Sequence, residues 1–347
     1  MNTPKLRGWY GVLLAGVLTG AVASAQDIHF SHLAAVPTQT NPAYTGLMAG
    51  RARVGVDYRS QWNNFTNGYT TASLSADMKA YRNRHDVAGL GLVVNSDQAG
   101  DLGFTTQQVA LSTSYLKGLD NGKTYLAFGI QNVFNFQRLD WSQAVAFDYE
   151  PLGEFSPGGR RNYWDIGAGV AYFMRVNRRL AWYAGAAGAH LNAPHVTFLR
   201  DDGADGEQVI PKWTLHAGGE IGFGRHNSVR PSAIMLYQWP FRQMKLGAFY
   251  RFKTDRGTAS RDQVAVHFGT HVRSNLSSER VNVDALIFAV RFDYEATSIT
   301  ASFDTNVSTL LPASRGVGGP ELSIVQEFDW GSPRKRRHAV KCPTFQY

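Results

Sequence analysis

The sequence has little charge, a single cysteine and, beyond its first residues, no long apolar run. Asp, Glu, Lys and Arg make up 18% of the 347 residues, against about 25% in typical soluble domains. One cysteine excludes a disulfide scaffold and a cysteine-built metal site. No stretch beyond residue 25 approaches the roughly 18 consecutive apolar residues of a membrane-spanning helix. Disorder is also excluded, because 44% hydrophobic and 12% aromatic side chains need burial.

Residues 1–25 have the pattern of a secretory signal peptide. Lys5 and Arg7 precede an apolar run, and Ala23-Ser24-Ala25 forms a small-x-small cleavage site. We therefore expect cleavage between Ala25 and Gln26, with an N-terminal membrane anchor as the alternative. No cysteine stands at the cleavage point, which argues against a lipoprotein.

From residue 51 onward the dominant pattern is alternation with period two, which places successive side chains on opposite faces of a strand. In the first such segment Ala52, Val54, Val56 and Tyr58 share one face, whereas Arg51, Arg53, Gly55 and Asp57 share the other. About fourteen segments follow this pattern, near 51–58, 69–80, 87–95, 104–116, 123–133, 163–174, 180–191, 213–223, 229–238, 243–252, 262–272, 281–292, 297–304 and 320–330. Most exceed the 5 to 6 residues of an average globular strand and approach the ~9 to 11 that cross an outer membrane.

The connections between these segments support a closed barrel. Short connections alternate with longer ones, and the two longest, Phe134–Asn162 and Asn192–Lys212, fall on the same parity. Outer-membrane barrels have short periplasmic turns and long external loops. We therefore predict an all-β fold, a transmembrane antiparallel β-barrel of about 14 strands over residues 51–330. Residues 26–50 would form a periplasmic or lumenal N-terminal segment and 331–347 a basic periplasmic tail, and a secreted soluble β protein is the alternative.

The sequence carries no recognisable catalytic or cofactor-binding pattern. A nucleophile elbow, a phosphate loop and a His-Glu-x-x-His motif are all missing. His267 and His271 share a strand face, but their Cα atoms would lie about 13 Å apart, which favours lumen-lining side chains over a metal site. The acidic run Asp201, Asp202, Asp205 and Glu207 lacks the spacing of an EF-hand loop. We expect no enzyme activity, no cofactor and no metal, and the topology keeps the basic residues away from nucleic acid.

Basic residues concentrate in the predicted periplasmic turns and in the tail. Such a rim could dock an acidic periplasmic protein, because complementary charge steers encounter; the alternative is a charged rim that only keeps the turns in water. The candidate partner-binding residues are Arg82, Arg84, Arg175, Arg178, Arg179, Arg225, Arg334, Lys335, Arg336 and Arg337.

Two ends of the mature chain resemble the PorP/SprF family of type IX secretion outer-membrane proteins. The opening carries Asn41-Pro42-Ala43-Tyr44-Thr45-Gly46, followed by Tyr58, Arg59, Gln61 and Trp62. The closing pattern includes Glu321-Leu322-Ser323-Ile324 and then Lys341, Cys342, Pro343 and Phe345, with Thr344 where a basic residue is expected. On these motifs the resemblance spans residues 26–347.

The resemblance implies a non-enzymatic component of the type IX secretion and gliding machinery, with outer-membrane lipid, a secreted surface adhesin and periplasmic secretion components as partners. A passive solute pore is the competing function, and the state of the lumen would discriminate the two. The turn chemistry of Asn41-Pro42 and Gly46 predicts that this segment folds into the lumen or across the periplasmic mouth. Cys342 is open to two interpretations, an intermolecular disulfide or an unpaired structural thiol.

Overall fold

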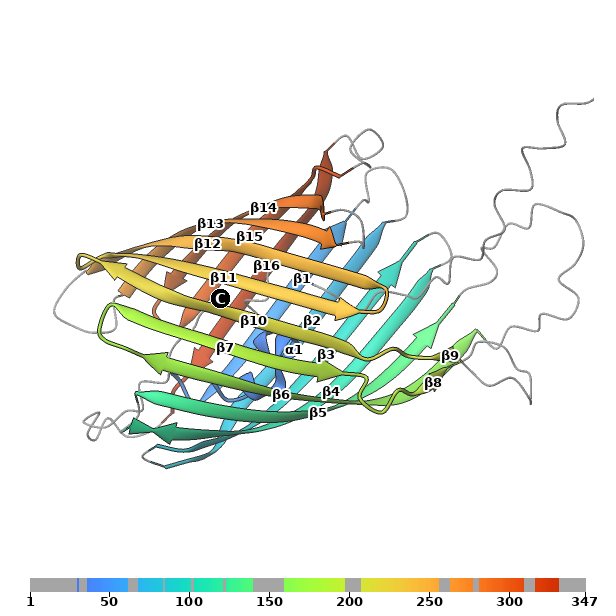
Figure 1. The fold of residues 1–347 in the computed structure, drawn as a ribbon, viewed down its shortest axis with the longest axis horizontal. Coiled ribbons are helices and arrows are strands. Elements are labelled where there is room, and N and C mark those ends of the chain that lie inside the picture. The colour runs from blue at the N-terminus through green and yellow to red at the C-terminus, as the bar shows by residue number, and fades with distance from the viewer. Residues whose placement is uncertain are drawn as a thin grey trace, which may run out of the picture.

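The structure, a computed structural model, describes residues 30, 36–61, 68–83, 85–100, 103–120, 123–139, 159–196, 207–255, 263–276, 281–308 and 316–330. They form a closed barrel of fourteen antiparallel strands, in which each strand pairs with the next along the chain and β16 returns to β1 (Figure 1). The predicted fold class and strand number are therefore confirmed. Within these described ranges, no helix is both long and apolar enough to span a membrane.

The barrel strands are long, as expected of a membrane wall. They are β1 (Ala52–Gln61), β2 (Tyr69–Arg82), β3 (Val87–Ala99), β4 (Phe104–Leu119), β5 (Thr124–Arg138), β6 (Arg160–Arg175), β7 (Leu180–Ala189), β10 (Lys212–Phe223), β11 (Asn227–Gln238), β12 (Phe241–Asp255), β13 (Gln263–Leu276), β14 (Val281–Tyr294), β15 (Thr297–Asn306) and β16 (Val317–Phe328). A two-stranded hairpin, β8 (His195–Val196) with β9 (Glu207–Gln208), stands outside the barrel sheet.

Alternation decides which face of each strand meets the lumen. In β1 the polar residues Arg53, Asp57 and Arg59 are buried, whereas Val56 and Tyr58 are about half exposed. The same contrast runs along β2, where Ser73 and Asp77 are buried and Leu74 is exposed. In these two strands apolar side chains therefore cover the outside of the wall, and polar ones the inside. This is the arrangement that a closed barrel adopts in lipid, where an open sheet edge would leave backbone groups unpaired.

The two longest connections lie at the same end of the barrel. One end, which we call the short-turn end, carries the turns 83–86, 120–123, 176–179, 224–226 and 295–296. The opposite end, the long-loop end, carries the connections 139–159 and 190–211. In outer-membrane barrels the short turns face the periplasm.

Strand β5 is longer than predicted, and the first long loop, between β5 and β6, is correspondingly shorter. β5 continues to Arg138 and pairs there with Arg160 of β6, so residues 134–138 and 160–162 belong to the ladder. Phe134 and Phe136 keep the outward alternation, both being exposed. The prediction ended β5 too early and began β6 too late, although Asn135 and Gln137 keep the inward alternation, both being buried.

The wall between β6 and β7 is continued by a side chain. β7 ends at Ala189, whereas β6 runs on toward the long-loop end. Beyond that point Leu191 N donates to Ile166 O, Asn192 Nδ2 donates to Trp164 O at 2.9 Å, and Asn192 Oδ1 accepts from Ile166 N at 3.0 Å. The carboxamide of Asn192 thus takes the place of a peptide group of the missing strand, and these groups of β6 remain paired.

Candidate functional site

Residues 36–50, which we call the inner segment, lie inside the barrel (Figure 1). The segment contains a short helix α1 (Pro37–Thr40) and a 3-10 turn η1 (Pro42–Tyr44). Both begin with a proline, which fixes φ at a helical value and lacks only an N–H that would be unpaired there anyway. Asn41 links the two turns, and its side chain accepts a hydrogen bond from Ala43 N. Asn-Pro therefore turns the chain sharply just before the first strand.

Asn41 attaches the inner segment to the wall formed by β6, β7 and β10. Its Nδ2 donates to Val170 O at 2.9 Å and to Ala186 O at 3.2 Å, and lies 3.0 Å from His216 Nε2. Tyr44 Oη lies 2.9 Å from His216 Nδ1 on the other side of the ring. A neutral imidazole has one donor and one acceptor nitrogen, so Asn41 and Tyr44 together satisfy both. All three side chains are buried.

Glycines on the inward face make room for this attachment. A Cβ atom at Gly129 would overlap the backbone of Pro42 and Ala43, and one at Gly169 would overlap the Asn41 carboxamide. Farther along, a Cβ at Gly89 would overlap Thr45 O. The backbone of the inner segment therefore packs directly on the backbone of β3 and β5, and the Asn41 side chain packs on the backbone of β6. Gly46 has φ of +71° and approaches Gly89 closely, so both the turn and the contact require glycine there.

A second attachment involves β1 and β2. Gly46 N donates to Asp77 Oδ2 at 2.8 Å, and the same carboxylate is paired by Arg53 in bidentate fashion, at 2.9 Å and 2.8 Å. Lys79 Nζ donates to Met48 O at 2.7 Å. Thr45 is held between the attachments, because Ser114 Oγ donates to its carbonyl at 2.5 Å. Hydrogen bonds that involve a charged group are stronger than those between neutral groups. The charged side chains Asp77 and Lys79 therefore hold the C-terminal part of the inner segment on β2.

Strands β13, β14 and β15, together with Arg59 of β1, carry a separate chain of ion pairs. Arg59 Nη2 lies 3.0 Å from Asp304 Oδ2, and Arg273 contacts the same oxygen at 2.8 Å and Asp284 at 2.7 Å. Next to it, Asp293 is paired with Arg291 at 2.7 Å and with His267 at 2.9 Å. This wall is therefore rich in paired charges.

The two candidate lumen histidines lie on the inward face, as the spacing indicates. His267 and His271 are both buried and flank the ring of Phe249. His267 contacts Asp293, whereas His271 Nε2 lies 3.3 Å from Ser232 Oγ. Among the described residues, no group of three His, Cys, Asp or Glu side chains is arranged to hold a metal ion.

The short-turn end brings together the described members of the candidate basic rim. Arg82 ends β2, Arg175 ends β6, Arg178 and Arg179 form the β6–β7 turn, and Arg225 lies in the β10–β11 turn. Four of the five are exposed, and Arg175 is half-buried. An acidic side chain of this end, Asp86, forms an ion pair: its Oδ2 accepts a hydrogen bond from Lys117 Nζ at 2.9 Å. This hydrogen bond lowers the pKa of Asp86 below its usual value.

Several predicted site residues lie outside the described part of the chain. They are the signal peptide with its cleavage point, and Trp62, Arg84, Arg334, Lys335, Arg336, Arg337, Lys341, Cys342, Pro343 and Phe345. Of the other family-motif residues, Asn41, Pro42, Tyr44 and Gly46 meet in the inner segment. Tyr58, Arg59 and Gln61 instead lie together on β1, where Arg59 donates to Gln61 Oε1 at 2.9 Å. The division of the chain into domains and the roles of these residues remain predictions.

Sequence reasoning did not single out His216 or the glycines of the wall. His216 alternates with Trp213 along β10 and so lies on the inward face as one polar residue among many. Gly129, Gly169 and Gly185 occupy inward positions on three neighbouring strands. Inward glycines at facing positions were the signal available in the sequence, because strands disfavour glycine unless another backbone approaches closely.

Comparison with known proteins identifies the family. No curated protein matches the sequence. Among solved structures the CymD monoaromatic hydrocarbon channel is similar, with a TM-score of 0.52 and 14% identity over 89% of this chain and 95% of that one. The P. putida toluene transporter TodX gives a TM-score of 0.47 and 11% identity over 84% of this chain and 94% of that one. At these identities the likeness concerns the barrel fold alone.

A family model, "Type IX secretion system membrane protein PorP/SprF", matches residues 22–317. The match includes the inner segment and nearly the whole barrel. It ends before β16 is complete, so it does not reach the closing pattern at 321–324 and 341–345, on which the resemblance to residue 347 partly depended. The match covers most of the sequence, and the chain therefore belongs to the PorP/SprF family of type IX secretion system membrane proteins.

Proposed function

We propose that the protein is a non-enzymatic docking component of the type IX secretion machinery in the outer membrane. Its long-loop end would contact a secreted surface adhesin, and its short-turn end would contact periplasmic secretion components. The observation that carries this proposal is the inner segment, which occupies part of the lumen and is attached to two walls of it. A docking role needs a stable barrel with two distinct ends, whereas a passive pore needs an open lumen.

The short-turn end offers the surface for the periplasmic contact. The arginines there project from four different elements, β2, β6, the β6–β7 turn and the β10–β11 turn, so the positive charge is spread around the rim. A charged rim of this kind steers an acidic partner and fixes its orientation. The long-loop end carries the β8–β9 hairpin, which stands outside the barrel sheet.

Affinity purification of the full chain from native outer membrane in mild detergent tests this function. Mass spectrometry should identify periplasmic secretion components and an adhesin in near-stoichiometric amount. Replacing Arg82 and Arg225 by Ser should reduce recovery of the periplasmic components. The matched control is Arg242→Ser at the opposite end, where the guanidinium lies over Tyr237 at 5.3 Å. Recovery of the barrel alone, or equal losses in both variants, would contradict the proposal.

The competing function is a passive pore, with which a polar inward face is compatible. The charged side chains Arg59, Asp304 and Arg273 of that face are, however, buried and paired with one another, whereas a water-filled lumen would expose them. Single-channel recording in planar bilayers separates the two functions. A stable, wide conductance of the unmodified protein would favour the pore, and a closed baseline would favour docking.

A further inference from the structure

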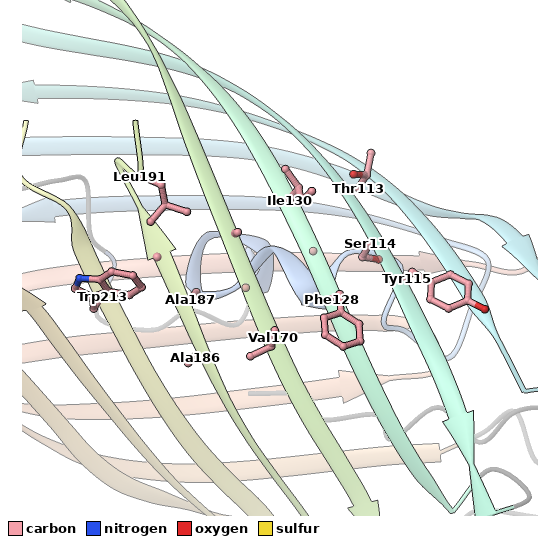
Figure 2. Close-up of a pocket in the computed structure, with 14 residues that line it drawn as sticks. Thr113, Ser114, Tyr115, Phe128, Ile130, Val170, Ala186, Ala187, Leu191 and Trp213 are labelled. Carbon is pink, nitrogen blue, oxygen red and sulfur yellow. The ribbon is translucent and has the colours of Figure 1, made fainter. Parts of the chain in front are cut away.

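The barrel wall has a hollow on its outward, apolar face, over the same strands that hold the inner segment on the inside. It has a volume of about 620 Å³ and is formed by β4, β5, β6, β7 and β10 (Figure 2). Small-molecule sites typically measure about 300–1,000 Å³. The hollow is therefore large enough for a bound molecule.

The hollow arises from two rows of outward side chains. In one row Ile130 pairs with Ala168, Ala168 with Gly188, and Gly188 with Trp213. In the next row Phe128, Val170 and Ala186 are aligned in the same way. Small residues on β6 and β7 thus lie between large ones on β5 and β10, which form the sides of the hollow (Figure 2).

We propose that this hollow binds one acyl chain of an anionic phospholipid from the periplasmic leaflet, whose phosphate is held at the β6–β7 turn. The sides of the hollow point toward the hydrocarbon of the membrane, since Ile130, Phe128 and Trp213 are about half exposed. Water in such a hollow would lack hydrogen-bond partners, and an empty hollow would forgo dispersion contacts. Hydrocarbon is the chemistry that fits.

The path from the hollow to the short-turn end has the chemistry of a phospholipid. Below the hollow, Tyr172 and Trp182 lie side by side on the outer face, with ring centroids 5.2 Å apart. Aromatic pairs of this kind prefer the boundary between hydrocarbon and headgroups. Beyond them the β6–β7 turn exposes Arg178 and Arg179. Arginine recognises phosphate oxygens through its planar set of donors.

The length of this path matches one leaflet. From Val170 in the hollow to Arg175 at the end of β6 the strand covers about 17 Å at ~3.3 Å per residue, which a tilt of ~35–45° reduces to about 12–14 Å along the membrane normal. Half of the ~25 Å apolar band of an outer-membrane barrel is about 12.5 Å. A phosphate at the turn therefore places the end of an acyl chain in the hollow. The site shares Arg178 and Arg179 with the basic rim, but it needs no protein partner, so the purified barrel tests it separately from docking.

Native mass spectrometry of the full-length barrel tests the site. The protein would be reconstituted with phosphatidylglycerol and phosphatidylethanolamine and then released from detergent. We expect one retained phosphatidylglycerol on the unmodified barrel. Ala186→Phe fills the hollow and should reduce retention about tenfold, equivalent to about 1.4 kcal/mol of binding. The control is Ala301→Phe, which places the same ring on the outward face of β15, away from the hollow.

A second pair of variants tests the headgroup. Arg178→Ser with Arg179→Ser should lose the preference for phosphatidylglycerol, and Arg225→Ser in the neighbouring turn should retain it. Equal retention in Ala186→Phe and Ala301→Phe would overturn the acyl-chain site. Unchanged preference in the double arginine variant would overturn the phospholipid assignment. A photo-crosslinker at Ile130 that captures a protein in native membranes, in place of lipid, would overturn both.

Discussion

Asn41 Nδ2 lies 3.0 Å from His216 Nε2, although 175 positions separate the two residues in the sequence. One belongs to the inner segment and the other to the inward face of β10. Because Tyr44 contacts the second nitrogen of the same ring, the family-motif residues Asn41 and Tyr44 act on one histidine. This contact attaches the inner segment, which precedes the first strand, to β10 in the middle of the sequence.

Removal of the Asn41 carboxamide should loosen the inner segment. Asn41→Ala removes the hydrogen bonds to Val170 O and Ala186 O, the contact with His216 Nε2 and the acceptor of Ala43 N, and a buried unsatisfied group costs about 1–3 kcal/mol. We expect a lower thermal unfolding midpoint in detergent and faster proteolysis within residues 36–50. The control is Asn282→Ala on the exposed start of β14. A midpoint equal to that of the control would show that the Asn41 contacts contribute nothing measurable.

Enlarging a wall glycine should displace the inner segment without adding a polar group. Gly129→Ala places a methyl group on the backbone of Pro42 and Ala43, and overpacking of this kind costs about 1–3 kcal/mol. We expect larger or more frequent conductance steps in planar bilayers. In Gly222→Ala, the matched control on the inward face of β10, the new atom meets its nearest neighbours at 3.5 Å, which is ordinary contact. Identical recordings for both variants would contradict the blocking role of the inner segment.

Removing only one partner of the Arg53–Asp77 ion pair should lower the free energy of unfolding strongly. Both groups are buried, and Asp77 also accepts from Gly46 N. Arg53→Met leaves an uncompensated carboxylate, for which about 3–5 kcal/mol is expected. Adding Asp77→Asn to Arg53→Met should restore part of the loss, because the remaining amide still accepts from Gly46 N. Urea unfolding of the single and double variants checks this; a double variant weaker than Arg53→Met alone would refute it.

The Asp86 contacts predict a dependence on pH at the short-turn end. Its pKa is lowered in the folded barrel, chiefly by the hydrogen bond from Lys117. The folded state therefore binds this proton less readily than the unfolded chain, so the stabilisation is present above the ordinary pKa of 3.8 and is lost as the pH falls below it. Asp86→Asn should lower the unfolding midpoint at neutral pH, and the difference from the unmodified protein should vanish in acid.

The effect of Asp86 should also weaken with salt, because the pair is exposed. Asp329→Asn serves as the control, since this carboxylate is exposed and lies 3.9 Å from Arg51. A difference between Asp86→Asn and the unmodified barrel that stays constant from neutral to acid pH would contradict the assignment.

The barrel could be predicted from the sequence because its signal is repeated in every strand. Alternation of the kind seen in Arg53, Gly55 and Asp57 against Val54 and Val56 recurs around the wall, and an error in one strand does not change the fold. Strand ends were less predictable because at the rim the outward face also becomes polar, as Arg138 of β5 and its partner Arg160 of β6 show. The backbone continues in the ladder there while the hydropathy pattern weakens.

The contact site of the inner segment could be predicted only in part. Asn41-Pro42 and Gly46 indicated a turn near the lumen, since their chemistry is local. The partner His216 could not be found, because nothing within one strand distinguishes a histidine that meets the inner segment from one, such as His271, that meets another strand. The outward hollow depends on Ala168, Ala186 and Gly188 becoming neighbours, and this register exists only in the assembled sheet.

The pairing of β1 with β16 sets an order of events during assembly. The first strand finds its second neighbour only when the last strand has been made, so the cylinder stays open until the chain is complete. The inner segment directly precedes β1, and Asn41, Tyr44, Thr45 and Gly46 contact strands from β2 to β10, whereas Gly50 N donates to Glu327 Oε2 of β16. It can therefore take its place while the cylinder still has a gap, and closure of the β1–β16 seam then encloses it. The same residues that occupy the lumen of the finished protein would thus serve as an internal template around which the curved sheet closes.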